Sequence, residues 1–200
     1  MNYYRNILTL IGSGILSVGS ILQAEAMDVL ENPILEISRI HNAIKIDGNL
    51  TELEWGKAKG TDYFLEIEPG ENILPAEKTE VKVAYDDQNL YVAFWAFAHP
   101  EDIRASYQNR DQAWMDDYVA IFLDTYGDAN NGTMIGSNPY GIQMDALNNG
   151  SGNDDPSFDL VYKSQGKITD EGYQVEMAIP FSSLSFPDKE VQEWKVGFYR

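Results

Sequence analysis

Hydrophobic and polar residues alternate with a period of two along most of the chain after residue 60, which is the pattern of half-buried β-strands. From Thr79 to Tyr85, for example, Val81, Val83 and Tyr85 fall on one face. The run from Leu90 to Ala98 is almost wholly apolar, so we predict a strand there that is central or covered on both faces. Further strands are predicted at Ala43–Gly48, Tyr63–Glu68, Tyr118–Asp124, Gly141–Leu147, Phe158–Lys163, Tyr173–Ile179 and Trp194–Tyr199.

One short segment has a helical pattern instead. Thr51 and Glu54 have the spacing of a capping box, and Leu50 and Trp55 have the spacing of a hydrophobic staple. This predicts a helix from Leu53 to Lys59 with Trp55 in the core. Turn residues separate the other runs, so we predict an all-β fold: a two-layer antiparallel β-sandwich of the jelly-roll or immunoglobulin-like kind, with one short N-terminal helix.

The first residues have the features of a signal peptide. Arg5 precedes an apolar run that ends near Leu22, and Ala24-Glu25-Ala26 is a small-x-small cleavage site. We therefore predict a signal peptide at 1–26 and export to the periplasm, the outer membrane or the cell surface. Residues 27–42 are predicted as a linker or entry strand, and 43–200 as the sandwich domain. Because the pattern stops at the end of a strand, we expect the domain to be truncated at its C-terminus.

The net charge of the chain limits the kinds of molecule that it is expected to bind. The chain has 32 acidic and 14 basic residues and a net charge of −18, which disfavours nucleic acid and anionic membranes. Divalent cations and neutral polar ligands suit it better. It has no cysteine, so disulfides, thiolate metal sites and cysteine nucleophiles are excluded.

Trp114 stands beside the acidic pair Asp116 and Asp117, and four interpretations compete for this segment. The tryptophan could pack over the end of the sandwich, since most tryptophans are buried. It could stack on a sugar ring whose hydroxyls are bound by Asp116, Asn138, Gln143 and Asp145.

The remaining two interpretations are a catalytic site and a calcium site. Catalysis has no support in a motif, because the chain lacks a nucleophile elbow, an H-E-x-x-H sequence and a P-loop, so we expect a non-catalytic domain. Calcium prefers six to eight oxygen ligands, roughly, and two polar loops are rich in oxygens without matching an EF-hand. One loop holds Asp124, Asp128, Asn130 and Asn131, and the other holds Asp154, Asp155 and Asp159. Solvated acidic loops explain the same residues.

An ordered series of motifs resembles family 9 carbohydrate-binding modules. The resemblance covers about Ile44 to Arg200, and a subgroup of bacterial outer-membrane proteins, in which such a domain precedes a predicted β-barrel, is more similar still. The motifs are Ile46-Asp47-Gly48, Glu54-Trp55, Val83–Asp87 with Leu90-Tyr91-Val92, Trp114–Asp124, Asn138-Pro139-Tyr140-Gly141, Tyr173–Pro180 and Trp194–Phe198.

The resemblance implies non-catalytic binding of an oligo- or polysaccharide of plant or algal type, possible structural calcium, and a continuation into an outer-membrane β-barrel. The family holds a sugar between two tryptophans; Trp114 matches one, and the other lies beyond Arg200. Ala120 stands where the family has a glutamate, and the family's sugar-binding arginine falls near Gly136. These departures keep an alternative open, in which the domain is a structural or gating domain in front of the barrel and has no sugar site.

Overall fold

The computed structural model describes residues 3–4, 34–129, 131–148, 154–155 and 157–200. The predicted signal peptide therefore lies outside the described residues except for Tyr3 and Tyr4, and it stays a prediction. No helix in the described part of the chain is long and apolar enough to cross a membrane.

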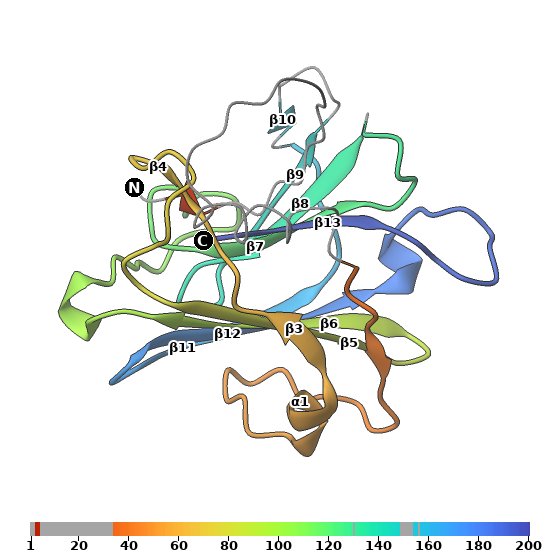
Figure 1. The fold of residues 1–200 in the computed structure, drawn as a ribbon, viewed down its shortest axis with the longest axis horizontal. Coiled ribbons are helices and arrows are strands. Elements are labelled where there is room, and N and C mark those ends of the chain that lie inside the picture. The colour runs from red at the N-terminus through yellow and green to blue at the C-terminus, as the bar shows by residue number, and fades with distance from the viewer. Residues whose placement is uncertain (1–2, 5–33, 130, 149–153, 156) are drawn as a thin grey trace, which may run out of the picture.

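Two β-sheets face each other across the core (Figure 1). One is five-stranded and antiparallel throughout, in the order β10-β9-β8-β7-β13. Its strands are β7 (Val119–Asp124), β8 (Gly132–Ser137), β9 (Gln143–Asn148), β10 (Asp154–Asp155) and β13 (Lys195–Tyr199).

The other sheet is six-stranded and runs β11-β12-β6-β5-β2, with β3 also paired to β5. Only β2 joins it in parallel. Its strands are β2 (Ser38–Arg39), β3 (Lys59–Thr61), β5 (Thr79–Tyr85), β6 (Asn89–Phe97), β11 (Lys163–Thr169) and β12 (Gly172–Pro180). The short pair β1 (Tyr3–Tyr4) and β4 (Glu66–Glu68) and the 3-10 turns η1 (Pro100–Asp102) and η2 (Phe181–Ser183) complete the elements.

β6 lies in the middle of the six-stranded sheet and is covered on both faces, as its apolar sequence predicts. Val92 and Phe94 point into the core between the sheets. Tyr91 and Ala93 point outward into a second, smaller cluster with Trp55. The predicted all-β sandwich with one short helix is thereby confirmed.

The helix α1 (Leu53–Lys57) covers the outer face of this sheet (Figure 1). Trp55 is 2% exposed, which confirms its predicted place in the core. The predicted capping box is wrong: Glu52 is the N-cap residue and no side chain caps the helix. Glu54 instead accepts a hydrogen bond from Asn42 at 2.7 Å, so a tertiary contact replaces the local one.

One buried carboxylate joins three of the motifs seen in the sequence. Glu176 on β12 accepts hydrogen bonds from the backbone N–H groups of Asp47 and Gly48, at 3.0 and 2.8 Å. Its other oxygen accepts one from the indole of Trp55, at 2.9 Å. The Asp47-Gly48 turn and the helix are therefore held to the sheet through a single side chain.

Two predicted strands are absent from the structure, and some observed strands, β8 among them, were not predicted. Residues 43–48 form no strand, because Ile44 packs in the cluster around Trp55 and the next residues bond to Glu176. No strand covers 158–162 either; the Leu160 N–H is bound by the Asp145 side chain and the Tyr162 carbonyl by the Gln143 side chain. Strand β8 was not predicted, since its sequence is small and polar; a side chain at Gly132 would collide with the Phe122 ring.

Candidate functional site

A long loop at one end of the sandwich carries Trp114. Residues 103–118 connect η1 to β7, and in Figure 1 the green trace of this loop runs from η1 at the left up to the start of β7. The turn after β8, residues 138–142, lies at the same end, because Val119 pairs with Ser137. The last strand also ends here, with Tyr199 opposite Ala120.

The buried side chain of Asp116 holds the loop in place by hydrogen bonds. Its carboxylate is 8% exposed and accepts the backbone N–H of Ser106 at 2.9 Å and the Ser106 hydroxyl at 2.8 Å. It also accepts the side-chain amide of Asn138 at 2.9 Å. The two arms of the loop and the 138–142 turn are thus held together by one carboxylate.

Asn138 is fully buried and has its hydrogen-bonding capacity filled by the protein. Its amide donates to Asp116 and to the Ser106 carbonyl, at 2.9 and 2.8 Å. Its carbonyl oxygen accepts the backbone N–H groups of Tyr140 and Ile142, at 3.0 and 2.9 Å. An asparagine side chain has two donors and one acceptor oxygen, so Asn138 has no donor left for a ligand.

The turn itself packs against the edge strand of the other sheet. Gly141 has a φ of +84°, and a Cβ on Gly166 of β11 would lie 2.4 Å from the Pro139 carbonyl oxygen. Glycine at both positions lets the turn lie directly on β11. At the end of the sandwich that carries Trp114, the backbone of the 138–142 turn therefore lies directly against β11 of the other sheet.

The 103–118 loop and the 138–142 turn carry two pairs of aromatic side chains in contact. Tyr107, 81% exposed, stacks on Tyr140 with ring centroids 4.3 Å apart and planes 4° apart. Trp114 is partly buried and meets the Tyr118 ring edge-on at 5.8 Å. Trp114 is therefore neither a core residue nor fully exposed. Tyr107 and Tyr140 were not predicted as site residues, although Tyr140 is part of the Asn138–Gly141 motif.

The other two predicted sugar-binding residues lie on β9, where both contact Arg110. Gln143 accepts the Arg110 guanidinium at 2.9 Å and donates to the Tyr162 carbonyl at 2.7 Å. Asp145 is fully buried; it pairs with Arg110 and accepts the Leu160 N–H at 2.5 Å. Burial raises the pKa of Asp145, although the Arg110 charge opposes the shift. Arg110 thus connects the loop, β9 and residues 160–162, a role that was not predicted for it.

Three carboxylates converge around the same arginine. Oxygens of Asp111, Asp145 and Asp159 lie within 4.8 Å of one another. The Arg110 Nε lies 3.5 Å from Asp111 and 3.0 Å from Asp159, so the guanidinium already supplies the cation of this cluster. These residues do not fit a metal site while Arg110 occupies it.

The predicted calcium residues lie at the opposite end of β7. Asp124 is buried, and its two oxygens accept the backbone N–H groups of Gly127 and Ala129 at 2.7 and 2.9 Å. Asp128 is exposed, and Asn130 lies outside the described residues. In the described part of the chain this loop offers no group of three carboxylates within reach of one ion. Calcium at Asp124, Asp128 and Asn130 therefore stays a prediction.

One family model and several solved structures match this chain. The family model described as carbohydrate family 9 binding domain-like matches residues 46–200. A structure from Bacteroides uniformis, described as a candidate carbohydrate-binding protein, has a TM-score of 0.61 at 13% identity and covers 81% of this chain and 80% of its own. No curated protein matches the sequence.

Two more structures are family 9 carbohydrate-binding modules from Caldicellulosiruptor kristjanssonii. The complex with cellotriose has a TM-score of 0.51 at 16% identity and covers 82% of both chains. The complex with glucose has a TM-score of 0.52 at 17% identity and covers 82% of this chain and 84% of its own. At these identities the structures show a shared fold, whereas the family model covers most of the sequence; this chain belongs to the carbohydrate family 9 binding domain-like family, a family of binding rather than catalytic domains.

Proposed function

We propose that this domain binds a saccharide without catalysis, on the aromatic side chains that the 103–118 loop and the 138–142 turn present, Tyr107, Trp114 and Tyr140. The observation that carries the proposal is the braced aromatic loop. Aromatic rings that stay partly exposed on a rigid support can stack on the apolar face of a pyranose ring at little entropic cost. Membership in a carbohydrate-binding family and the solved complexes with cellotriose and glucose support the same ligand class.

The four polar residues predicted as sugar ligands make their hydrogen bonds within the protein and hold the loop, the turn and Arg110 in place. Asp116 and Asn138 hold the loop to the turn, while Gln143 and Asp145 hold Arg110. We infer that they position the aromatic side chains and that the tyrosine hydroxyls at the surface are available to sugar hydroxyls. The bound sugar itself is proposed as a plant- or algal-type oligosaccharide.

The exported location is part of the same proposal. It rests on the sequence of residues 1–26, and a role in polysaccharide breakdown or uptake at the cell envelope would follow from it. A continuation into an outer-membrane β-barrel rests on the resemblance to that subgroup.

A structural or gating role without a sugar site is the second candidate. The observation that favours it is that Asp116, Asn138, Gln143 and Asp145 all have partners within the protein. Under this alternative, the aromatic side chains serve only as packing at the end of the sandwich.

A fluorescence titration separates the two candidates. The protein is titrated with cello-, xylo-, manno- and algal oligosaccharides, with and without calcium. We expect saturable binding that is lost in Trp114→Ala and weakened about tenfold in Tyr107→Ala, which corresponds to the loss of about 1.4 kcal/mol of binding free energy.

Trp194→Phe is the matched control, because Trp194 packs on Phe181 and Phe186 at the other end of the sandwich and its loss should leave binding intact. Near-UV circular dichroism checks that each variant is folded. A folded wild-type protein that binds none of these sugars would support the structural candidate instead.

A further inference from the structure

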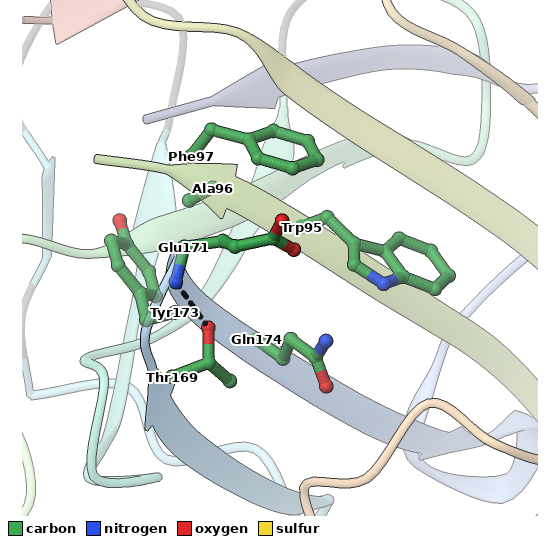
Figure 2. Close-up of a pocket in the computed structure, with 7 residues that line it drawn as sticks. All are labelled: Trp95, Ala96, Phe97, Thr169, Glu171, Tyr173 and Gln174. Carbon is green, nitrogen blue, oxygen red and sulfur yellow. Dashed lines mark hydrogen bonds between the residues drawn. The ribbon is translucent and has the colours of Figure 1, made fainter. Parts of the chain in front are cut away.

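A second surface with the features of a ligand site lies on the outer face of the six-stranded sheet. It is a shallow, open hollow between β6 and β12, lined by Trp95, Phe97, Thr169, Glu171 and Gln174 together with Ala96 and Tyr173 (Figure 2). None of these residues belongs to the 103–118 loop or the 138–142 turn. The hollow is therefore separate from the aromatic surface around Trp114.

Trp95 is held in a fixed position beside the hollow. Across the sheet it lies between Glu80 on β5 and Gln174 on β12. The Lys82 ammonium lies 5.6 Å from the indole centroid and is itself fixed by a 2.9 Å hydrogen bond to the Trp55 carbonyl. Lys82 pairs with Ala93, two residues before Trp95, whereas the hollow extends toward Phe97, two residues after it. We infer that one indole face contacts Lys82 and that the other borders the hollow.

Polar groups with unused hydrogen-bonding capacity in the described part of the chain lie near the same tryptophan. In Figure 2 the Glu171 side chain reaches toward Trp95, and the Gln174 amide lies below it. Gln174 accepts one long hydrogen bond from the Leu50 N–H, at 3.5 Å, and Glu171 is bonded only through its backbone. The Trp95 indole N–H, the Gln174 amide N–H groups and the Glu171 carboxylate have no hydrogen-bond partner among the residues that the structure describes.

We propose that this hollow is a second saccharide-binding site, which takes a single neutral pyranose unit. An aromatic face bordered by two kinds of donor and one carboxylate acceptor matches a sugar ring, whose hydroxyls both donate and accept. The hollow is open and borders a single tryptophan, so a ligand would rest against one indole face, which supports one ring, and would not be enclosed. The carboxylate of Glu171 and the net charge of −18 disfavour uronic acids and sulfated sugars.

This proposal goes beyond the function proposed for Trp114, because the two sites share no residue. A domain with two separate sugar contacts could hold two parts of one polysaccharide chain and gain avidity without tight binding at either site.

Proton–nitrogen NMR correlation spectra test it, since each of the 4 tryptophans gives its own indole signal. The protein is titrated with glucose, mannose, galactose and xylose over the millimolar range. We expect the Trp95 signal to shift saturably with at least one of them, in the wild type and equally in Trp114→Ala. The Trp114 signal reports the first site independently, so failure of one site is distinguishable from failure of the other.

Glu171→Gln should weaken the sugar affinity reported by Trp95 about tenfold, the equivalent of about 1.4 kcal/mol, while the Trp55 signal, whose indole bonds to Glu176, checks that the fold is unchanged. Two results would overturn the proposal: a Trp95 signal that stays in place with all of these sugars, or one that moves in the wild type but not in Trp114→Ala. Unchanged affinity in Glu171→Gln would overturn the role assigned to that carboxylate.

Discussion

At the scale of single residues, Glu176 connects the helix α1 and the Asp47-Gly48 turn to strand β12. It is fully buried and accepts hydrogen bonds from Trp55, Asp47 and Gly48. Burial raises the pKa of Glu176, and these three hydrogen bonds lower it without cancelling the effect. Because the pKa is higher in the folded than in the unfolded protein, the contribution of Glu176 to stability is fully present below the unfolded pKa. It is lost as the pH rises through the folded pKa.

Replacement of Glu176 by glutamine tests this account. The variant must turn an amide N–H₂ group toward at least one donor, so we expect it to unfold about 1–3 kcal/mol more easily than the wild type near pH 4. The difference in free energy of unfolding between the two proteins should narrow as the pH rises, because only the wild type has a carboxyl group at position 176 that ionises and loses its contribution. Urea unfolding of both proteins at several pH values measures it, with Glu190→Gln as an exposed control. A gap that widens with rising pH would contradict the raised pKa.

At the scale of elements, Asp116 should act as a brace for the 103–118 loop. Asp116→Ala leaves the Asn138 amide without one of its acceptors and is expected to cost about 1–3 kcal/mol of stability. Saccharide binding at Trp114 should weaken together with stability, because the aromatic side chains lose their fixed support. Thermal unfolding and the sugar titration measure the two effects side by side. Gln112→Ala on the same loop, an exposed side chain, is the matched control. Loss of binding with unchanged stability would instead make Asp116 a direct ligand.

The sequence predicted elements well where burial alone determines them. β5 has the predicted bounds and β6 differs by one residue at each end, because Val81, Val83 and the apolar run of β6 fill the core. The sequence pattern failed to predict the structure where backbone groups bond to side chains instead of to a neighbouring strand. Leu160 and Tyr162 are as apolar as strand residues, yet they bond to Asp145 and Gln143, two contacts between distant segments that no local pattern encodes.

At the scale of the whole molecule, the sequence pointed to the loop that carries Trp114 as the candidate site, and that site stays a prediction. What the sequence did not show is that the predicted polar residues have partners within the protein. Gln143 and Asp145 looked available for a ligand because nothing in a linear pattern shows that Arg110 reaches both of them. The exposed stack of Tyr107 on Tyr140 joins two loops more than thirty positions apart. Tyr140 belongs to the Asn138–Gly141 motif, and this was the one sequence signal for the pair. No motif pointed to Tyr107.

The net charge of −18 makes a prediction for the whole chain. Self-repulsion of so many carboxylates opposes the compact state, and salt screens it, so NaCl should raise the melting temperature, by about 2–4 °C for each kcal/mol of repulsion removed.

Calcium bound at Asp124, Asp128 and Asn130 would add a rise in melting temperature that NaCl of equal ionic strength does not give, because an ion that binds only the folded state stabilises it by mass action. Asp128→Asn should remove that extra rise and keep the response to NaCl. Equal melting curves in calcium and in matched NaCl would refute the calcium site, and a melting temperature that falls with added NaCl would refute the role of self-repulsion.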